Sequence, residues 1–293
     1  MFERLIGNEK IKKDLDKVLK NDNILHTYMF IGISGIGKKE FAKEFAKGIL
    51  CTNTDKFCNY CKSCLEFENN NHPDFYYIGL EDESSIKIET IRNMQKKVQE
   101  LPIVSKKKVY IIDDCEYMTS EAQNCLLKTI EEPPEFVTVI LITSNENKIL
   151  NTIKSRALKI YFNGIEQDKL LEHLEKEHQI KNISQNMLKA YGGSIGKAIQ
   201  MSKQPELYYN IEKVFDNIEK YNVISAMQEL EILYKEKEII QDILDYINVI
   251  FFNKAKENIK YIEYIKAVEE TKNKLNSNCN YDMTIDSLLF NIW

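Results

Sequence analysis

The chain has 293 residues, of which 43% are hydrophobic and 29% are charged, and its formal net charge is −5. This length allows two or three domains, and the composition is that of an ordinary globular protein. The acidic balance argues against binding to DNA through a basic bulk field, and no apolar run approaches the roughly 18 residues that span a bilayer. Because the N-terminal residues carry charge and lack the apolar core of a signal peptide, we expect a cytoplasmic protein with no membrane contacts.

The first 163 residues alternate between strand and helix patterns. Apolar runs rich in β-branched and aromatic residues predict strands at 28–31, 75–78, 109–112, 137–143 and 158–162. Amphipathic stretches at about 38–50, 87–99 and 118–131 predict helices between them. Strands separated by helices indicate βαβ units, so residues 1–163 are expected to form a doubly wound α/β domain around a mostly parallel sheet.

The remainder of the chain carries no strand signal. Residues 164–205 read as a small domain of three short helices, with Gly192-Gly193-Ser194 breaking the pattern before the third. Pro205 marks a second boundary, and from Glu206 to Trp293 there is neither glycine nor proline. Apolar residues recur there at helical spacing, so the predicted fold is α/β plus all-α, with a helical domain at 206–293.

A glycine-rich segment follows the first strand and opens a helix. Gly32, Gly35, Gly37 and Lys38 fit a P-loop, in which backbone N–H groups wrap a phosphate and the lysine reaches its oxygens. Lys39 stands where a Ser or Thr hydroxyl should bind Mg²⁺, and an ammonium cannot coordinate a metal. We therefore expect binding of ATP or ADP to be weak or absent.

The strand at 109–112 ends in two acids, as in a Walker B motif. Asp113 occupies the position of the Mg²⁺-binding carboxylate, and Asp114 the position where a glutamate usually polarises the attacking water. The aspartate is one methylene shorter, and a displacement of about 1 Å can cost on the order of 100-fold in rate. Together with Lys39, this favours a retired ATPase, and a weakened ATPase is the alternative.

Four cysteines, Cys51, Cys58, Cys61 and Cys64, lie within 14 residues. The C-x2-C spacing is typical of zinc, which prefers a tetrahedron of soft ligands, and a cytosolic chain disfavours disulfides. Four thiolates leave no open position on the metal, so we predict a structural Zn²⁺ module at 51–64, four unrelated cysteines being the alternative. The remaining three cysteines are expected in the core: Cys115, Cys125 and Cys279.

These features in this order resemble the clamp-loader subunits of bacterial DNA polymerase III, which are members of the AAA+ superfamily. A cysteine module after the P-loop helix is shared with the gamma/tau and delta-prime types. Several stretches are similar to the motifs of that family: Ile24–Phe30, His72-Pro73-Asp74, Ile88–Arg92 and Asn124–Pro134. The resemblance is dense over residues 5–200 and only architectural over 206–293, where the family has its helical collar.

The resemblance implies roles for three further residues. Ser144 lies at the sensor 1 position, and Lys197 lies near the sensor 2 position without matching its arginine. Ser155-Arg156-Ala157 is similar to the Ser-Arg-Cys motif, whose arginine reaches the ATP site of the neighbouring subunit. Arg156 is thus the expected catalytic residue in trans, although the third residue of the motif differs. Residues 164–205 correspond to the lid.

Within the family, the defective P-loop favours the delta-prime type, and because the sequence ends at Trp293 we expect no polymerase-binding extension like that of tau. The resemblance then implies a hetero-pentamer with gamma/tau and delta subunits, which loads the sliding clamp on primer–template DNA. Two alternatives stay open. One is an active ATPase of the gamma/tau type, and the other is a stand-alone DNA-binding AAA+ protein, against which the acidic balance counts.

Overall fold

The structure, a computed structural model, describes residues 2–80, 83–181, 183–277 and 279–293. The chain forms two compact units. Unit 1 comprises Met1–Leu170 together with Ser194–Gly196, and unit 2 comprises Leu171–Gly193 and Lys197–Trp293. The three-domain division expected from the sequence stays a prediction.

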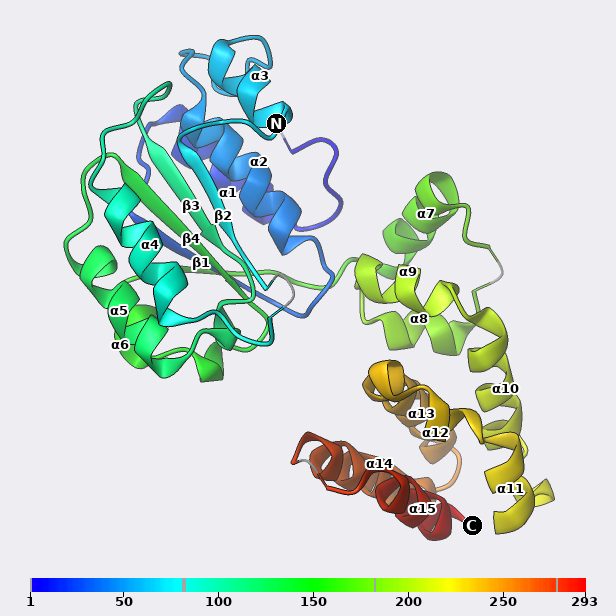
Figure 1. Ribbon diagram of the computed structural model, residues 1–293. Coiled ribbons are helices and arrows are strands. Elements are labelled where there is room, and N and C mark those ends of the chain that lie inside the picture. Colours follow the sequence, from blue (N-terminus) through cyan, green and yellow to red (C-terminus); the bar gives the residue numbers. More distant parts are fainter. Residues whose placement is uncertain (1, 81–82, 182, 278) are drawn as a thin grey trace. The chain divides into compact units, whose positions relative to one another are not determined.

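Unit 1 is built on a parallel sheet of five strands with the order β2-β3-β4-β1-β5 (Figure 1). Its strands are β1 (Thr27–Ile31), β2 (Phe75–Ile78), β3 (Lys108–Ile112), β4 (Val137–Thr143) and β5 (Leu158–Tyr161). The predicted strands are confirmed to within one residue at each end. Its helices are α1 (Glu9–Lys20), α2 (Lys38–Leu50), α3 (Lys62–Glu68), α4 (Ile88–Val98), α5 (Ser120–Glu131) and α6 (Asn151–Lys154), with 3-10 turns η1 (Cys115–Tyr117) and η2 (Glu146–Lys148).

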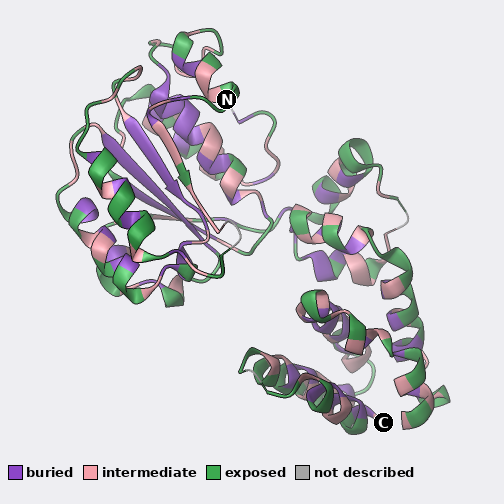
Figure 2. Ribbon diagram, in the orientation of Figure 1, coloured by how far each residue is buried: buried purple, intermediate pink, exposed green. Residues whose placement is uncertain are grey.

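The sheet separates two apolar cores. One core packs the side chains of α4 and α5 against one face of the strands, and the other packs α1 and α2 against the opposite face. Strands β1, β3 and β4 are buried along their whole length, as Figure 2 shows by colour, whereas the edge strands β2 and β5 are partly exposed. Continuous burial on both faces explains why these strands read as apolar runs. Because the strands are parallel, the carboxyl ends of β1 and β3 lie at the same edge of the sheet. The P-loop begins at this edge, directly after β1.

Helix α7 (Gln167–His178) crosses the boundary between the units, and α9 (Ile195–Ser202) begins in unit 1 and continues in unit 2. The other helices of unit 2 are α8 (Gln185–Tyr191), α10 (Pro205–Asp216), α11 (Val223–Glu229), α12 (Ile232–Lys235), α13 (Ile240–Ala255), α14 (Tyr261–Asn276) and α15 (Tyr281–Ile292), with 3-10 turns η3 (Ile218–Lys220) and η4 (Lys237–Ile239). The sequence-based expectation of helices beyond residue 163 is confirmed. Helix α1 was not among the elements predicted from the sequence.

Helix α13 is the centre of unit 2, because it packs against α8, α10 and α14. Aromatic pairs fix these contacts: Tyr208 and Tyr246 meet edge to face at 5.3 Å, and Phe215 and Phe251 do the same at 5.3 Å. Edge-to-face contacts of this kind add stability beyond the area that they bury. Within the described residues, no helix has both the length and the apolar character needed to cross a membrane.

Of the three cysteines expected in the core, Cys115 is buried and Cys125 is partly buried, but Cys279 is exposed. The expectation is wrong for Cys279, which lies just before α15 among polar residues of a loop. A small thiol is tolerated at such a surface position, so residue type alone is a weak guide to burial there.

Candidate nucleotide and metal sites

The P-loop connects β1 to α2, as the sequence predicts. The two glycines Gly35 and Gly37 have φ values of +74° and +93°, a conformation that L side chains rarely adopt. The buried Lys38 folds back over the loop, and its Nζ donates hydrogen bonds to the carbonyl oxygens of Gly32 (2.7 Å) and Ile33 (2.8 Å). Burial lowers the pKa of Lys38, while Glu116 and Asp113 oppose that shift. The loop thus keeps a lysine and a helix N-terminus that can meet an anion.

The first turn of α9 lies directly on the P-loop. The hydroxyl of Ser194 donates to the carbonyl of Ser34 (2.9 Å), and the N–H of Gly196 donates to the carbonyl of Gly35 (3.0 Å). A Cβ placed on Gly35 would stand 2.4 Å from Ser194 Oγ and 3.0 Å from Gly196 Cα. Glycine is therefore required here by the close approach as well as by its backbone angle. This contact was not foreseen from the sequence.

The magnesium position is taken by side chains of the chain itself. Lys39 Nζ lies 3.7 Å from Asp113 Oδ2 and 4.3 Å from the centre of the Tyr77 ring. The Tyr77 hydroxyl donates to the same Asp113 oxygen at 2.6 Å, and burial together with Asp113 raises the pKa of Tyr77. A divalent ion would need that oxygen and would face the ammonium. The residues present therefore do not fit the Mg²⁺ that such a fold implies.

The remaining acids of this edge are engaged with neighbours. Asp114 has a left-handed backbone (φ 50°), and burial together with Asp113 and Glu116 raises the pKa of its carboxyl. The hydroxyl and the N–H of Ser144 both donate to Glu116 Oε1, the latter at 2.9 Å. Although burial opposes it, these bonds lower the pKa of Glu116. Ser144, expected at the sensor 1 position, therefore has Glu116 as its partner in this structure. The sequence analysis did not identify Glu116.

Lys197 lies in unit 2 and is paired within that unit. Its Nζ stands 2.7 Å from Asp245 Oδ2 and 3.4 Å from Asp242 Oδ1, both on α13. Bonds from Lys197 and Lys272 outweigh burial and lower the pKa of Asp245. The sensor 2 role expected for Lys197 stays a prediction, since the structure gives it acidic partners on a neighbouring helix.

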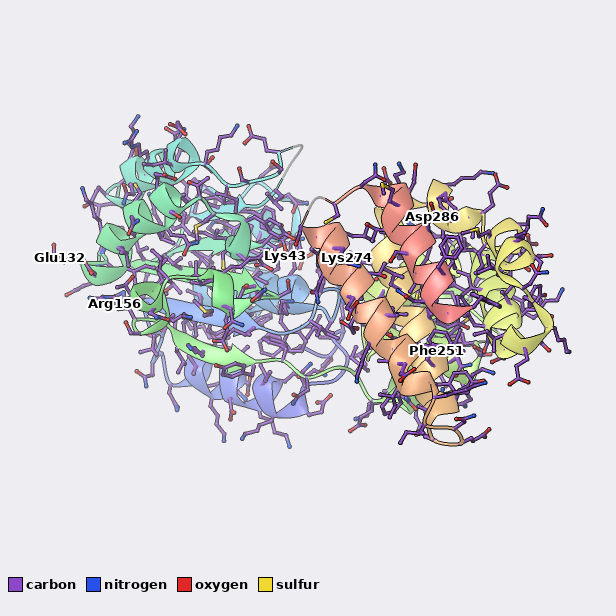
Figure 3. The ribbon with its side chains drawn as sticks, turned by 90° about the horizontal axis from the view of Figure 1, so that it is seen from below. Lys43, Glu132, Arg156, Phe251, Lys274 and Asp286 are labelled. Carbon is purple, nitrogen blue, oxygen red and sulfur yellow. The ribbon has the colours of Figure 1, made fainter. Side chains whose placement is uncertain are left out.

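Arg156 lies just after α6, at the surface of unit 1. Its Nη2 is 3.0 Å from Glu131 Oε1, and its Nη1 donates to the carbonyl of Thr152 at 3.0 Å. Both charged side chains are about two-fifths exposed, at 40% and 44%. Figure 3 shows Arg156 on the opposite side of unit 1 from Lys43 of α2, the helix that the P-loop opens. In this structure the partners of Arg156 are thus Glu131 and Thr152, away from Lys43 of α2.

The four cysteine sulfurs predicted to bind metal come together. They all lie within 4.8 Å of one another, with Cys51 3.7 Å from Cys58, Cys58 3.9 Å from Cys64 and Cys51 4.0 Å from Cys61. Four thiolates at about 2.3 Å from a tetrahedral zinc stand about 3.8 Å apart, whereas a disulfide measures about 2.05 Å. The spacing fits one metal ion held by all four sulfurs.

Backbone N–H groups donate hydrogen bonds to two of these sulfurs. The N–H of Cys61 donates to Cys58 Sγ (3.3 Å), and the N–H of Cys64 donates to Cys61 Sγ (3.4 Å). Against the effect of burial, hydrogen bonds from Thr52, Cys64 and Cys58 lower the pKa of Cys61 to about 6, while burial raises the pKa of Cys64. A thiolate is the form that binds metal, so the hydrogen bonds to Cys61 favour the form in which this residue could hold an ion.

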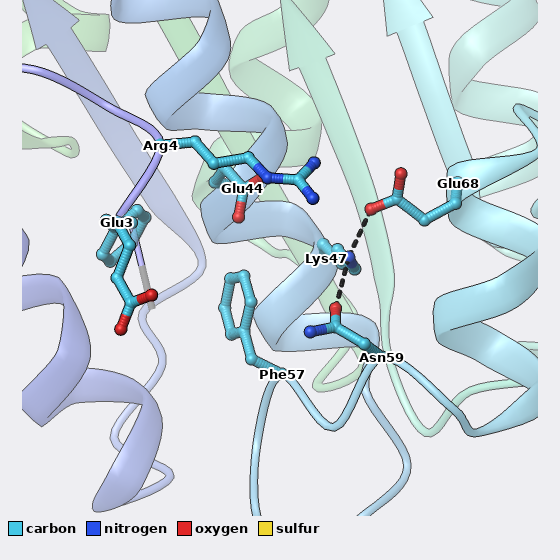
Figure 4. A pocket seen from close by; sticks show the side chains of 8 residues that line it. Glu3, Arg4, Glu44, Lys47, Phe57, Asn59 and Glu68 are labelled. Atoms are coloured by element: carbon cyan, nitrogen blue, oxygen red, sulfur yellow. Dashed lines mark hydrogen bonds and ion pairs between the residues drawn. The ribbon is translucent and has the colours of Figure 1, made fainter.

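A hollow of about 550 Å³ lies where α2 meets the cysteine segment (Figure 4). On its wall, the buried Lys47 donates to Asn59 Oδ1 (2.6 Å) and pairs with Glu68 of α3. Phe57 closes one side over Gly48, where a Cβ would stand 2.3 Å from the Phe57 ring. These contacts tie the cysteine segment to α2.

A second anchor joins the cysteine segment to the segment before β3. His72 Nδ1 accepts from the N–H of Asp74 (3.0 Å), so the neutral ring carries its proton on Nε2, which contacts Ser63 Oγ at 2.9 Å. Burial lowers the pKa of His72 and keeps it neutral. The fully buried Asp74 accepts from the N–H groups of three consecutive residues, Ile103 (2.7 Å), Val104 (2.8 Å) and Ser105 (2.8 Å).

Comparison with known proteins identifies the family of the chain. The sequence profile of the family described as DNA polymerase III, delta subunit matches residues 7–166, which is more than half of the chain. The chain belongs to this DNA polymerase III family. The matched region holds the whole sheet of unit 1, the P-loop, the four cysteines and Arg156.

Curated relatives point to the same group. DNA polymerase III subunit tau/gamma of Haemophilus influenzae is 33% identical over 211 residues, which are 69% of this chain and 30% of that protein. Subunit gamma/tau of Mycoplasma genitalium is 33% identical over 76% of this chain and 39% of that protein. Subunit delta' of Bacillus subtilis is 31% identical over 73% of this chain and 64% of that protein. The chain thus spans well under half of these gamma/tau relatives and just under two thirds of the delta' relative.

Among solved structures, a DNA polymerase III gamma subunit-related protein of Thermotoga maritima is similar over 95% of this chain and 98% of that one. Its TM-score is 0.51 and its sequence identity is 18%, so the likeness concerns the fold alone.

Proposed function

We propose that the chain is a delta-prime-type subunit of the DNA polymerase III clamp loader. It assembles with gamma/tau and delta subunits into a hetero-pentamer that loads the sliding clamp on primer–template DNA, and it does not itself hydrolyse ATP. The observation that carries the proposal is the pairing of Lys39 with Asp113 at the magnesium position, because phosphoryl transfer in P-loop proteins depends on the bound metal. Asp114, which is shorter than the usual glutamate, adds a second impediment.

In this proposal, Arg156 acts on the nucleotide of a neighbouring subunit. Its partial exposure, and its place on the opposite side of unit 1 from Lys43 in Figure 3, support a role outside the chain. A planar, permanently charged guanidinium suits the oxygens of a γ-phosphate, and an arginine finger supplied in trans is worth roughly 10³–10⁵ in rate. Glu131 holds Arg156 in the unassembled chain through an exposed ion pair, which is weak enough to exchange for a phosphate.

The four cysteines would hold a structural Zn²⁺ ion. The fit of their sulfur spacing to a tetrahedron supports zinc, and a closed set of thiolates supplies folding energy to the module at 51–64 without reaction chemistry.

Unit 2 would supply the collar. The apolar side chains Ile285, Leu288 and Leu289 of α15 are buried inside the unit, so they stabilise the unit itself. Contacts with other subunits would then be made by large apolar side chains of α15 that are exposed, such as Met283 (69% exposed) and Phe290 (62% exposed). Met283 and Phe290 are seven residues apart in α15 and so share one face of this helix, which supports an assembly role.

A gamma/tau-type ATPase is the second candidate, because gamma/tau relatives reach 36% identity while the delta' relative stands at 31%. Steady-state ATP turnover by the isolated, metallated chain separates the two. We expect wild type to turn over ATP no faster than the Lys38→Ala variant. Turnover on the order of 1 s⁻¹, as in working enzymes, would contradict the proposal.

A further inference from the structure

A groove of about 490 Å³ lies within unit 2, between the start of α10 and the segment formed by α11 and α12. Its walls come from residues 203–210 and 229–236, and helices α10 and α11 pack against each other. Pockets that hold ligands measure roughly 300–1,000 Å³, so the groove is large enough for side chains of a partner. All lining residues that the structure describes precede α13, so this α10–α12 groove lies on other helices than Met283 and Phe290 of α15.

Three apolar side chains line the α10–α12 groove. Leu207 of α10 and Ile232 of α12 are half-buried, so each packs partly on unit 2 and leaves part of its surface open. Pro205 is exposed at the first position of α10 and has no N–H to donate. Apolar surface gathered in a hollow in this way is stabilised when another apolar group excludes water from it.

The polar residues of the groove are mostly acidic. Glu206 and Glu229 are exposed, Glu236 is half-buried, and Lys203 is the one basic residue among the described lining residues. Within the described part of the chain, none of these three glutamates has a basic side chain at ion-pair distance. The surroundings add to this charge, since residues 206–293 contain 16 acidic and 10 basic residues. Three carboxylates are therefore available to cations that a partner brings.

The combination of apolar and acidic side chains selects one kind of partner. A groove between packed helices accepts a further helix, whose apolar side chains at positions i, i+3 and i+4 insert between the walls. Lysines or arginines beside that stripe would meet the glutamates, whereas an acidic segment or the phosphates of a nucleic acid would be repelled. Exposed ion pairs are individually weak, so the apolar side chains supply most of the affinity and the carboxylates decide which segments bind.

We propose that the α10–α12 groove is a docking site for a basic amphipathic helical segment of a partner protein. Leu207 and Ile232 receive its apolar side chains, and Glu206, Glu229 and Glu236 pair with its lysines or arginines. The inference goes beyond the proposed function, because it assigns a peptide site to helices that carry no part of the P-loop, the cysteine cluster or the Arg156 segment.

The test is fluorescence anisotropy of the full-length, metallated chain with a labelled Leu/Lys peptide of about 15 residues, whose leucines follow the i, i+3, i+4 pattern. Two peptides of the same length are compared with it: one has glutamate in place of each lysine, and the other has glutamine in place of each leucine. We expect both to bind at least about tenfold more weakly than the Leu/Lys peptide. Amide hydrogen exchange at residues 203–210 and 229–236 should slow when the Leu/Lys peptide is bound.

Glu229→Lys combined with Glu236→Lys should lower the affinity for the Leu/Lys peptide at least about tenfold, because two attractions become repulsions. Glu263→Lys combined with Glu270→Lys is the matched control, since it makes the same change of charge at exposed positions of α14 outside the groove. At about 0.15 M salt, where charges farther apart than about 8 Å are largely screened, its affinity should stay within about twofold of wild type. Ile232→Gln should weaken binding at least about fivefold through loss of an apolar contact.

Equal affinity for the Leu/Lys and Leu/Glu peptides would overturn the inference, and so would equal losses in the groove and control variants, or no binding at about 100 μM peptide. Thermal unfolding shows whether each variant keeps its fold, and the exchange experiment on wild type decides the matter for any variant that does not, because slowed exchange elsewhere would also overturn the inference. Assembly of the chain with other polymerase subunits is measured separately, so the two proposals fail independently.

Discussion

Asp74 offers the sharpest test of how the segment before β3 is held in unit 1. Its carboxylate is fully buried and accepts three backbone N–H groups at 2.7–2.8 Å from Ile103, Val104 and Ser105. These bonds fix the segment that leads into β3. In that segment the side chains of Leu101 and Ile103 are about three-quarters exposed, so they contribute little apolar packing. The perturbation is Asp74→Ala, which removes all three acceptors and leaves the donors in place.

The expected cost follows from the number and kind of these bonds. A hydrogen bond to a charged group contributes about 1.5–3 kcal/mol, and the three share one carboxylate, so they do not add fully. The segment can also relax toward water, which recovers part of the loss. We expect Asp74→Ala to lower the free energy of unfolding of unit 1 by about 3–5 kcal/mol, at the upper end for single substitutions. For a unit of this size that corresponds to a fall in Tm of about 10 °C.

Two measurements check this prediction. Urea denaturation gives the free energy, and amide hydrogen exchange of peptides covering 99–107 reports the segment directly. The exchange of Ile103, Val104 and Ser105 should accelerate at least about tenfold. Asp14→Ala, at an exposed position on α1, is the control and should change the free energy by no more than about 0.5 kcal/mol. An Asp74→Ala protein within about 1 kcal/mol of wild type, with unchanged exchange, would refute the reasoning.

Two further predictions concern the cysteine module. Wild-type protein purified without chelator should carry about one zinc per chain, as measured by metal analysis. Cys61→Ser should release the zinc and expose residues 51–64 to protease in limited proteolysis, while the sheet of unit 1 stays folded. Metal-free wild-type protein would contradict the metal site, whereas bound iron would change only the identity of the ion. Gly48→Ala should lower the free energy of unfolding by about 1–3 kcal/mol, and with it the Tm, and should weaken metal retention. The reason is that the new Cβ would stand 2.3 Å from the Phe57 ring and 2.6 Å from Leu19 Cδ1. A Tm equal to that of wild type would contradict the close packing around Gly48.

The sheet of unit 1 was predictable from sequence because its strands are buried on both faces. Runs such as Val137–Thr143 are wholly buried in a parallel sheet, which leaves a continuous apolar signal. Helix α1 escaped prediction because lysines and aspartates dominate its composition and only Leu15 and Leu19 are buried. A signal spread over so few positions is easily lost among charged residues.

Only part of the candidate site could likewise be predicted from the sequence. The P-loop and the four cysteines are local in sequence, so their chemistry shows in the spacing. Tyr77 and Glu116 could not be found in that way, because their partners Asp113 and Ser144 lie on other strands or loops and meet them only through strand pairing. The ion pair between Arg156 and Glu131 likewise joins residues that only the fold brings together. Contacts of this kind depend on the register of the sheet, which periodicity does not encode.

The most direct test of the account is clamp loading by a reconstituted assembly. The chain is combined with gamma/tau-type and delta subunits, and loading of the sliding clamp onto primed DNA is followed for wild type, Arg156→Ala and Glu131→Ala. All three should assemble, because loss of an exposed ion pair costs less than about 1 kcal/mol. Arg156→Ala should load clamps more slowly while total ATP turnover falls only in part, and Glu131→Ala, which keeps the guanidinium, should load at the wild-type rate. A chain that does not enter the assembly, or an Arg156→Ala assembly that loads clamps at the unmutated rate, would contradict the account.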